Sequence, residues 1–281
     1  MTSRRWDRTA GVDTPVSLWS ELTRRSPVLA GTTAFHLMML LVAVGLFAFD
    51  PREVMGINVW IKPMKFMASI TIYLVTVTWL IGYIERPRWF VRTIAWGISV
   101  CMVVETTMIF LQAGRGVRSH FNDASSFDAT IFGIMGIGVI IDTLLMLLML
   151  VLFFRRQKKL PGTYLWGIRL GILMFLAGGI VGGWISSHGG HTVGAVDGGP
   201  GLPLLNWSVN AGDLRIAHAL GLHGLQVMPI VGYLLSKRLD SRFGPVATTT
   251  MLVTFGVLYG ATMLGMFLQA MAGVSIVTLW Q

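Results

Sequence analysis

Long apolar runs constrain this chain more than any other feature of its sequence. A helix needs about 20 apolar residues to cross the hydrocarbon core of a bilayer. The runs do not alternate apolar and polar residues as the strands of a membrane barrel do. We therefore predict an all-α integral membrane protein, a bundle of about seven transmembrane helices, with spans at 28–49, 58–83, 90–113, 129–153, 165–186, 213–236 and 246–272.

The composition supports a membrane setting. Of the 281 residues, 54% are hydrophobic and 12% are charged, whereas charged residues make up about 25% of a typical soluble domain. The net charge is +9, but the basic residues lie in short segments between the apolar runs, where they act as topology signals. Nucleic acid is therefore not an expected partner, and the lipid bilayer is. The single cysteine, Cys101, excludes an intrachain disulfide.

The basic residues divide unevenly between the two predicted sides of the membrane. Cytoplasmic segments carry an excess of Lys and Arg, so the richer side is expected to be cytoplasmic, with the N-terminus inside, the C-terminus outside and a bacterial inner membrane as the location. The richer side holds fifteen residues, Arg4, Arg5, Arg8, Arg24, Arg25, Arg86, Arg88, Arg92, Arg155, Arg156, Lys158, Lys159, Lys237, Arg238 and Arg242. The other side holds six, Arg52, Lys62, Lys65, Arg115, Arg118 and Arg215.

The chain divides into a short polar tail and a membrane domain. Residues 1–27 lack the apolar region of a signal peptide and are predicted to be a cytoplasmic tail. Residues 28–281 form the membrane domain, which includes a Gly- and Pro-rich outer loop at 187–212. Loops of this length are usually functional or disordered, so the loop is either a cover over a site or a flexible tether. Gly178, Gly179, Gly182 and Gly183 predict a close approach between helices.

Two carboxyl groups lie inside predicted spans. Glu105 belongs to the third span and Asp142 to the fourth, and a carboxylate there must be paired, protonated or bound to a cation. Both are candidate catalytic residues. Gln112 lies on the same helical face as Glu105. Asp128 and Asp213 open spans and are expected to be helix N-caps.

Five of the six histidines fall toward the predicted outer side. His36 is the exception, and we expect it to form a hydrogen bond between helices. In the sixth span, Arg215, His218 and Gln226 share one helical face, from which His223 is turned by about 140°. Imidazole is the commonest metal ligand. The candidate metal ligands are His120, His188, His191, His218 and His223.

Several cations lie near the outer ends of helices. Lys65 and Arg215 stand close to helix N-termini, where both the helix dipole and the positive-inside tendency disfavour them. They either extend toward lipid headgroups or bind a small anionic ligand. The candidate binding residues are Lys65, Arg115, Arg118, Arg215 and Gln226.

The leading functional hypothesis is an outer-facing, histidine-rich pocket that binds haem b or a transition metal (zinc, copper or iron) for redox chemistry or metal handling. In its sharpest form, His218 and His223 bind the group with at least one of His120, His188 and His191. One alternative is a small-solute or ion transporter with an intramembrane Glu/Asp/His relay. Another is a zinc-dependent membrane hydrolase acting on lipid, so the sequence leaves open whether the protein is an enzyme.

The hydrolase alternative comes from a resemblance. Seven spans with His and Asp residues resemble the broad pattern of the alkaline ceramidase and progestin-receptor-like superfamily, which implies zinc-dependent chemistry. That superfamily places two His one turn apart on a late helix. Here His218 and His223 are five residues apart, and the second span opens without a Ser-x-x-x-His motif. The resemblance therefore does not extend to the ligand spacing.

Overall fold

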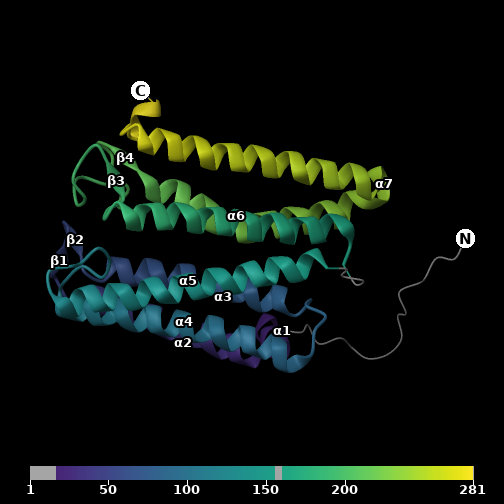
Figure 1. Cartoon of the computed structure of the whole chain (residues 1–281), viewed down its shortest axis with the longest axis horizontal. Coiled ribbons are helices and arrows are strands. Elements are labelled where there is room, and N and C mark those ends of the chain that lie inside the picture. The colour runs from purple at the N-terminus through teal and green to yellow at the C-terminus, as the bar shows by residue number, and fades with distance from the viewer. Residues whose placement is uncertain (1–16, 156–159, 281) are drawn as a thin grey trace, which may run out of the picture.

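The computed structural model describes residues 17–155 and 160–280, most of which are helical (Figure 1). In this described part, six helices are long and apolar enough to cross a membrane. The all-α class is confirmed, and the apolar helices agree with an integral membrane protein. The helices are α1 (Leu18–Arg25), α2 (Pro27–Phe49), α3 (Ile61–Ile81), α4 (Arg88–Arg115), α5 (Ser126–Phe154), α6 (Gly162–Ser187), α7 (Leu214–Met271) and the short 3₁₀ helix η1 (Val277–Trp280). The strands are β1 (Glu53–Val54), β2 (Ile57–Asn58), β3 (Thr192–Val193) and β4 (Gly212–Asp213).

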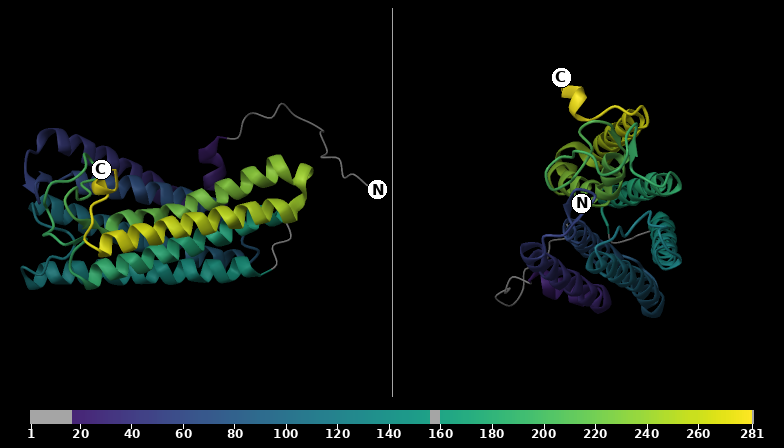
Figure 2. Two further views of the ribbon diagram at one scale, coloured as in Figure 1. Left: turned by 90° about the horizontal axis from the view of Figure 1, so that it is seen from above. Right: turned by 90° about the vertical axis from the view of Figure 1, so that its left-hand side faces the viewer.

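Helix α7 contains the residues of the last two predicted spans. Its backbone leaves helical geometry at Gly244, where φ is 80° and ψ is 156°, values that glycine adopts without strain. Figures 1 and 2 show the chain reversing there, so that two arms, 214–243 and 245–271, lie side by side. The hydroxyl of Tyr259 in the second arm donates to the carbonyl of Leu220 in the first at 2.7 Å.

The helices form two layers. In Figures 1 and 2, α2 to α5 make up one layer, and α6 and α7 make up the other. The second layer is packed backbone against backbone, because a Cβ atom on Gly178 would lie 2.7 Å from the amide nitrogen of Leu222. A Cβ atom on Gly182 would lie 2.8 Å from the ring of His218. The predicted close approach is therefore confirmed at Gly178 and Gly182, and absent at Gly183, which has open space around it.

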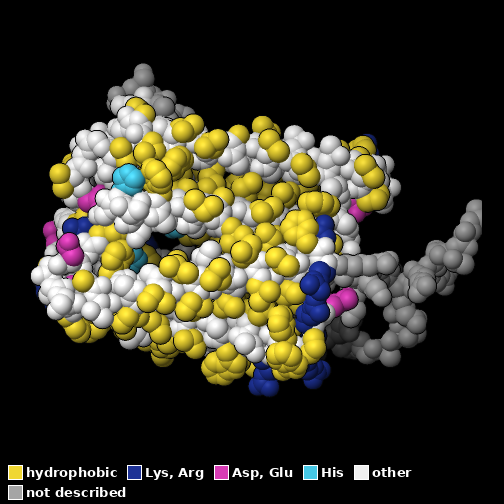
Figure 3. All heavy atoms as spheres, viewed as in Figure 1, with side chains coloured by type: hydrophobic (Ala, Val, Ile, Leu, Met, Phe, Trp, Pro, Cys, Tyr) yellow, Lys and Arg dark blue, Asp and Glu magenta, His cyan; other side chains and the backbone are white. Residues whose placement is uncertain are grey.

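The two ends of the molecule differ in their charge. We call one the loop end, which holds segments 50–60, 116–125 and 188–213, and the other the basic end, which includes Arg86, Arg88, Lys237, Arg238 and Arg242. Figure 3 shows most of the visible Lys and Arg side chains at the basic end. The same figure shows a hollow between the two layers, nearer the loop end.

A single apolar core joins the layers in the half nearer the basic end. Ile168 and Ile172 of α6 are fully buried in the same cluster as Met146 and Met149 of α5. Burial of such side chains stabilises the contact by about 1.5–3 kcal/mol each. Toward the loop end, polar side chains face the region between the layers, and the apolar contact is smaller. There Phe121, from the loop after α4, packs against a second cluster that includes Val181 and Ile185 of α6.

Helix ends follow local sequence signals with one correction. Asp213 caps α7, accepting from the Arg215 amide at 3.0 Å as predicted. Asp128 does not cap α5, because Ser125 takes that place and accepts from the Asp128 amide at 3.1 Å. Serine is as good an N-cap residue as aspartate, and Ser125 precedes Asp128 in the chain.

The predicted N-terminal tail is partly helical, since residues 18–25 form α1. Residues 1–16 of the tail lie outside the described chain, and Pro27 already belongs to α2. Arg4, Arg5, Arg8, Arg156, Lys158 and Lys159 therefore lie outside the described residues.

Two short hairpins order the loop end. Strands β1 and β2 pair around Met55 and Gly56, and β3 pairs with β4 so that Thr192 lies opposite Asp213. The second pairing ties together the two ends of loop 187–212. Sequence analysis did not identify these strands, because two residues are too few to show a period of two.

Candidate functional site

A buried acid–base pair lies between α4 and the loop that follows it. Glu105 is 5% exposed, and its Oε1 lies 3.6 Å from Nε2 of His120. Its second oxygen, Oε2, is buried without a hydrogen-bond partner among the described residues. Burial, and then the charge of Lys62, hold the pKa of His120 well below its ordinary value. The imidazole is therefore neutral at pH 7, and the carboxyl group has spare hydrogen-bonding capacity.

Two cations near this pair, Lys62 and Arg118, repel each other electrostatically. Lys62 lies in the first turn of α3, its ammonium is 5.7 Å from the ring centre of Phe66, and its charge acts on Glu105. Arg118 carries a buried Nε with no hydrogen-bond partner among the described residues. Within residues 17–155 and 160–280, neither side chain forms an ion pair. A buried donor without a partner is costly, so these two groups are the clearest signs of a binding site.

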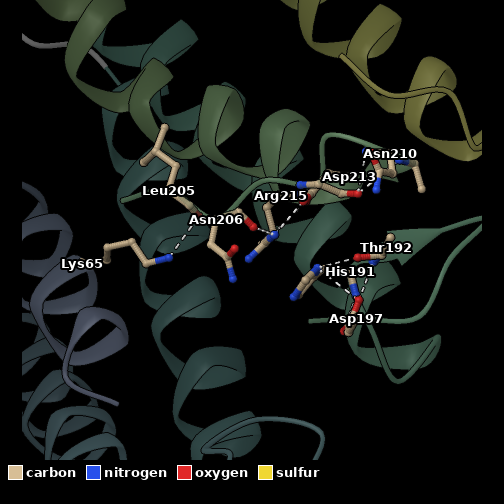
Figure 4. A network of polar contacts seen from close by, with 11 residues as sticks. Lys65, His191, Thr192, Asp197, Leu205, Asn206, Asn210, Asp213 and Arg215 are labelled. Atoms are coloured by element: carbon tan, nitrogen blue, oxygen red, sulfur yellow. Dashed lines mark hydrogen bonds and ion pairs between the residues drawn. The ribbon is translucent and has the colours of Figure 1, made fainter. Parts of the chain in front are cut away.

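Lys65 and Arg215 bind backbone carbonyls of loop 187–212 (Figure 4). The ammonium of Lys65 donates to the Leu205 carbonyl at 3.1 Å. Arg215 forms an ion pair with Asp213, at 2.6 Å, and also donates to the Asn206 carbonyl. The two predicted anion contacts therefore bind loop carbonyls, and Arg215 already has a carboxylate partner.

A second acid–base pair lies within the loop. Nδ1 of His191 is 3.2 Å from Oδ1 of Asp197. Asp197 also accepts from the backbone amides of Thr192, at 2.9 Å, and His191, at 3.2 Å. Burial, followed by the charge of Arg215, lowers the pKa of His191 to about 4. Burial opposes ionisation of Asp197, but its hydrogen bond from Thr192 and the charge of His191 keep its pKa below the ordinary value.

Arg115 and Gln112 belong to a separate contact between α4 and α5. Arg115 pairs with Asp128, and Gln112 donates to the same carboxylate at 2.8 Å. Asp128 thus neutralises Arg115, which was predicted to bind an anion. The contact explains the polar residues at this helix end without a ligand.

Deeper between the layers, Asp142 pairs with Tyr73. The single Tyr73 hydroxyl lies 2.8 and 3.0 Å from the two carboxyl oxygens of Asp142. The Tyr73 ring stacks on Phe175 of α6, with ring centres 5.3 Å apart. The sequence pattern indicated Asp142 as a candidate residue but not Tyr73. The two residues are 69 positions apart in the chain, so their contact depends on helix packing.

The remaining candidates on α7 bind neighbouring protein groups. Nδ1 of His218 lies 2.7 Å from the Gly178 carbonyl, and the charge of His218 acts on His120. Nδ1 of His223 lies 3.3 Å from Oε1 of Gln226, whose amide nitrogen donates to Thr76 of α3 at 3.1 Å. As expected from the helical spacing, the two histidines face different partners.

The histidines do not gather into one site. His188 stacks on Trp184, with ring centres 4.8 Å apart, whereas His191 bonds to Asp197. In the described part of the chain, there is no group of three or more His, Cys, Asp or Glu side chains that could hold a metal ion. The metal or haem site stays a prediction from the sequence, and the donor set offers it no three-ligand group.

No protein-family model matches the sequence, and no characterised protein or solved structure is detectably similar to it. Function must therefore be argued from the site itself. The site combines two unpaired cations, a carboxyl group with a free oxygen and a polar loop above them.

Proposed function

We propose that this protein is a membrane carrier for a small oxyanion, which binds in the hollow between the two layers near the loop end. One observation carries the proposal. Lys62 and Arg118 repel each other electrostatically, neither forms an ion pair in the described chain, and Nε of Arg118 is buried without a hydrogen-bond partner. A carboxylate, phosphate or sulfate group supplies the missing charge.

The chemistry of these side chains favours an oxyanion over other ligands. Guanidinium groups donate in a planar fork that matches oxyanions, and an ammonium adds a point charge. Lys65, Arg118 and Arg215 all act electrostatically on Lys62. The carboxyl groups of the same region, those of Glu105, Asp197 and Asp213, number three against these four cations. An anion between Lys62 and Arg118 therefore relieves both repulsion and desolvation.

A carrier fits the arrangement of the layers better than an enzyme does. The site lies between two helical layers whose larger shared apolar core is in the half nearer the basic end, with a smaller contact through Phe121 at the loop end. Transporters commonly bind their solute between two such units and rock them around it. Glu105, the Tyr73–Asp142 pair and the Thr76–Gln226–His223 chain supply titratable and hydrogen-bonding groups below the site. These groups support the relay that the transporter hypothesis requires.

The proposed carrier crosses the membrane seven times. Helices α2 to α6 provide five, and the two arms of α7 provide one each. The basic end is cytoplasmic by the positive-inside rule, so the N-terminus is inside and the loop end is outside, in an inner membrane of bacterial type. Reporter fusions after Lys159 and after Gln281 are expected to lie on opposite sides of the membrane. Fusions on the same side overturn the seven-span count.

Binding of hydrogen phosphate to the detergent-purified protein tests the site. We expect calorimetry to detect binding that Lys62→Ala weakens by about tenfold or more, because hydrogen bonds to charged groups contribute about 1.5–3 kcal/mol. Lys62→Arg should retain most of the affinity. The matched control is Arg88→Ala, which removes a cation at the basic end.

Uptake of labelled phosphate into proteoliposomes tests transport. Binding without uptake keeps the anion site and overturns the carrier. A wild-type protein that binds no phosphate overturns both.

A further inference from the structure

Loop 187–212 presents a hydrogen-bond acceptor to the region of the anion site. The acceptor is Nε2 of His191. The other ring nitrogen, Nδ1, lies 3.1 Å from the Thr192 hydroxyl and 3.2 Å from Oδ1 of Asp197. In Figure 4 the ring points away from Asp197, toward the side of the network where Arg215 and Lys65 lie. Nothing in the described part of the chain forms a hydrogen bond with Nε2.

Two groups beside Nδ1 favour the tautomer that carries its proton there. An ionised carboxylate of Asp197 lies 3.2 Å from Nδ1, and the Thr192 hydroxyl, 3.1 Å away, can accept from the same N–H, which leaves a lone pair on Nε2. The backbone amides of His191 and Thr192 also donate hydrogen bonds to Asp197. These bonds favour the ionised carboxylate, which has no proton to donate to the His191 ring. The low pKa of His191, about 4, keeps the ring neutral at pH 7. Nε2 is therefore an acceptor and not a donor.

The charges around His191 are equal in number. The charged groups that face it are Lys62 of α3, Arg215 of α7, Asp213 of β4 and Asp197 of its own loop. Asp213 is paired with Arg215, and the His191 side chain is 15% exposed. Lys62 forms no ion pair in the described part of the chain, so a ligand that reaches it meets a cation together with one neutral acceptor. Such a site satisfies an anion that also carries a hydrogen-bond donor.

We propose that His191, oriented by Asp197, selects oxyanions that carry a hydroxyl group, such as hydrogen phosphate or a 2-hydroxycarboxylate, over oxyanions without one. The proposal rests on the anion site proposed above and names its substrate class. Selection follows because a buried acceptor that loses its donor costs about 1–3 kcal/mol. A site that hydrogen-bonds a substrate hydroxyl rejects the analogue that lacks it.

Hydrogen phosphate and sulfate form a matched pair for the test. Both are tetrahedral dianions at mildly alkaline pH, and only hydrogen phosphate has an O–H group. Calorimetry on the purified full-length protein should give a phosphate affinity at least about fivefold above that of sulfate. The affinities of lactate and propionate give the same comparison for carboxylates, because only lactate carries a hydroxyl group. Comparing lactate with hydrogen phosphate shows which kind of oxyanion binds more tightly.

Two variants separate selection from loop structure. His191→Leu should bring phosphate and sulfate to within about twofold of each other. Its backbone carbonyl can still accept from the Leu214 amide at 3.0 Å, which keeps the loop tied to α7. Asp197→Asn frees the ring tautomer, so that Nε2 can donate, and should shift the preference toward sulfate. His188→Leu is the control, because His188 lies in the same loop region but stacks on Trp184.

The outcomes distinguish this inference from the function on which it rests. Equal binding of phosphate and sulfate by the wild type overturns the selection and leaves the anion site standing. A preference that persists in both His191→Leu and Asp197→Asn also overturns it. If neither anion binds to the wild type, the anion site itself is wrong and the selection falls with it.

Discussion

Two buried polar clusters of this protein differ in how well their hydrogen bonds are satisfied. His36 is 0% exposed and joins α2 to α4. Its Nδ1 lies 2.7 Å from the Thr32 carbonyl, and its Nε2 lies 2.8 Å from the Thr106 hydroxyl and 3.3 Å from the Met102 carbonyl. The predicted hydrogen bond between helices is thus confirmed, and both ring nitrogens have partners.

The cluster near the loop end is incomplete and less deeply buried, because Lys62 and Arg118 are half-buried. Oε2 of Glu105 and Nε of Arg118 have no partners among the described residues, and Lys62 has no ion pair there. Native structures satisfy most buried polar groups, so each exception needs a reason. Single unpaired atoms also occur at Thr71 and Gln269. The comparison teaches that an intramembrane polar residue alone does not mark a site, and that an unpaired donor and an unpaired acceptor in one charged cluster are the stronger sign.

The largest expected effect is on ligand affinity at the incomplete cluster. Arg118→Ala should weaken hydrogen phosphate binding by about tenfold or more, because it removes a charged donor. Its thermal stability should not fall, since no internal hydrogen bond of the side chain is lost. Calorimetry and thermal unfolding measure the two quantities. A large loss of stability with unchanged affinity would make Arg118 a structural residue and break the contrast with His36.

The opposite pattern is expected at His36. His36→Ala removes hydrogen bonds to α4 and leaves a cavity, which should cost about 2–3 kcal/mol of stability. Phosphate affinity should stay within about twofold of the wild type when measured well below the melting temperature. Thermal unfolding in detergent gives the first quantity and calorimetry the second. An affinity loss as large as that of Arg118→Ala contradicts the purely structural role.

Intermediate effects are expected where cations hold the loop. Lys65→Ala and Arg215→Ala each remove a side chain that binds a carbonyl of loop 187–212. Limited proteolysis should cut this loop faster in both variants, and phosphate affinity should fall by about threefold to tenfold. Arg88→Ala, at the basic end, is the control. Equal and negligible effects from all three variants would leave contact with lipid headgroups as the better account of Lys65 and Arg215.

The smallest effect is expected at a satisfied cluster outside the spans. Asp50 accepts from Arg52 at 2.7 Å and from the Trp60 ring nitrogen at 2.8 Å. The hydrogen bonds from Arg52 and then Trp60 hold the pKa of Asp50 below its ordinary value. This contribution to stability is present above about pH 4 and is lost as the pH falls further. Asp50→Asn should lower the melting temperature slightly at neutral pH and leave phosphate binding intact. An equal decrease at low pH would rule out the charge as the cause.

The sequence by itself determined the class of fold. Residues within one run decide whether that run can cross a bilayer, so the observed helices begin and end within a few residues of the predicted spans. Local signals also specified the Asp213 cap and the close approach at Gly178. Such features depend on neighbours within a few positions, and pattern reasoning reaches them. The same reasoning placed most histidines toward one end.

Only the tertiary structure decided which polar groups meet. Tyr73 and Asp142 are 69 residues apart, and Gln226 and Thr76 are 150 apart, so helix rotation and layer packing determine these pairs. Arg115 and Arg118 look alike in the sequence, yet Asp128 neutralises one and the buried Nε of the other stays unpaired. His188 and His191 were both candidate metal ligands, but His188 stacks on Trp184 and His191 lies 3.2 Å from Asp197. Charge and spacing are properties of a chain, whereas hydrogen-bond satisfaction is a property of the packed molecule.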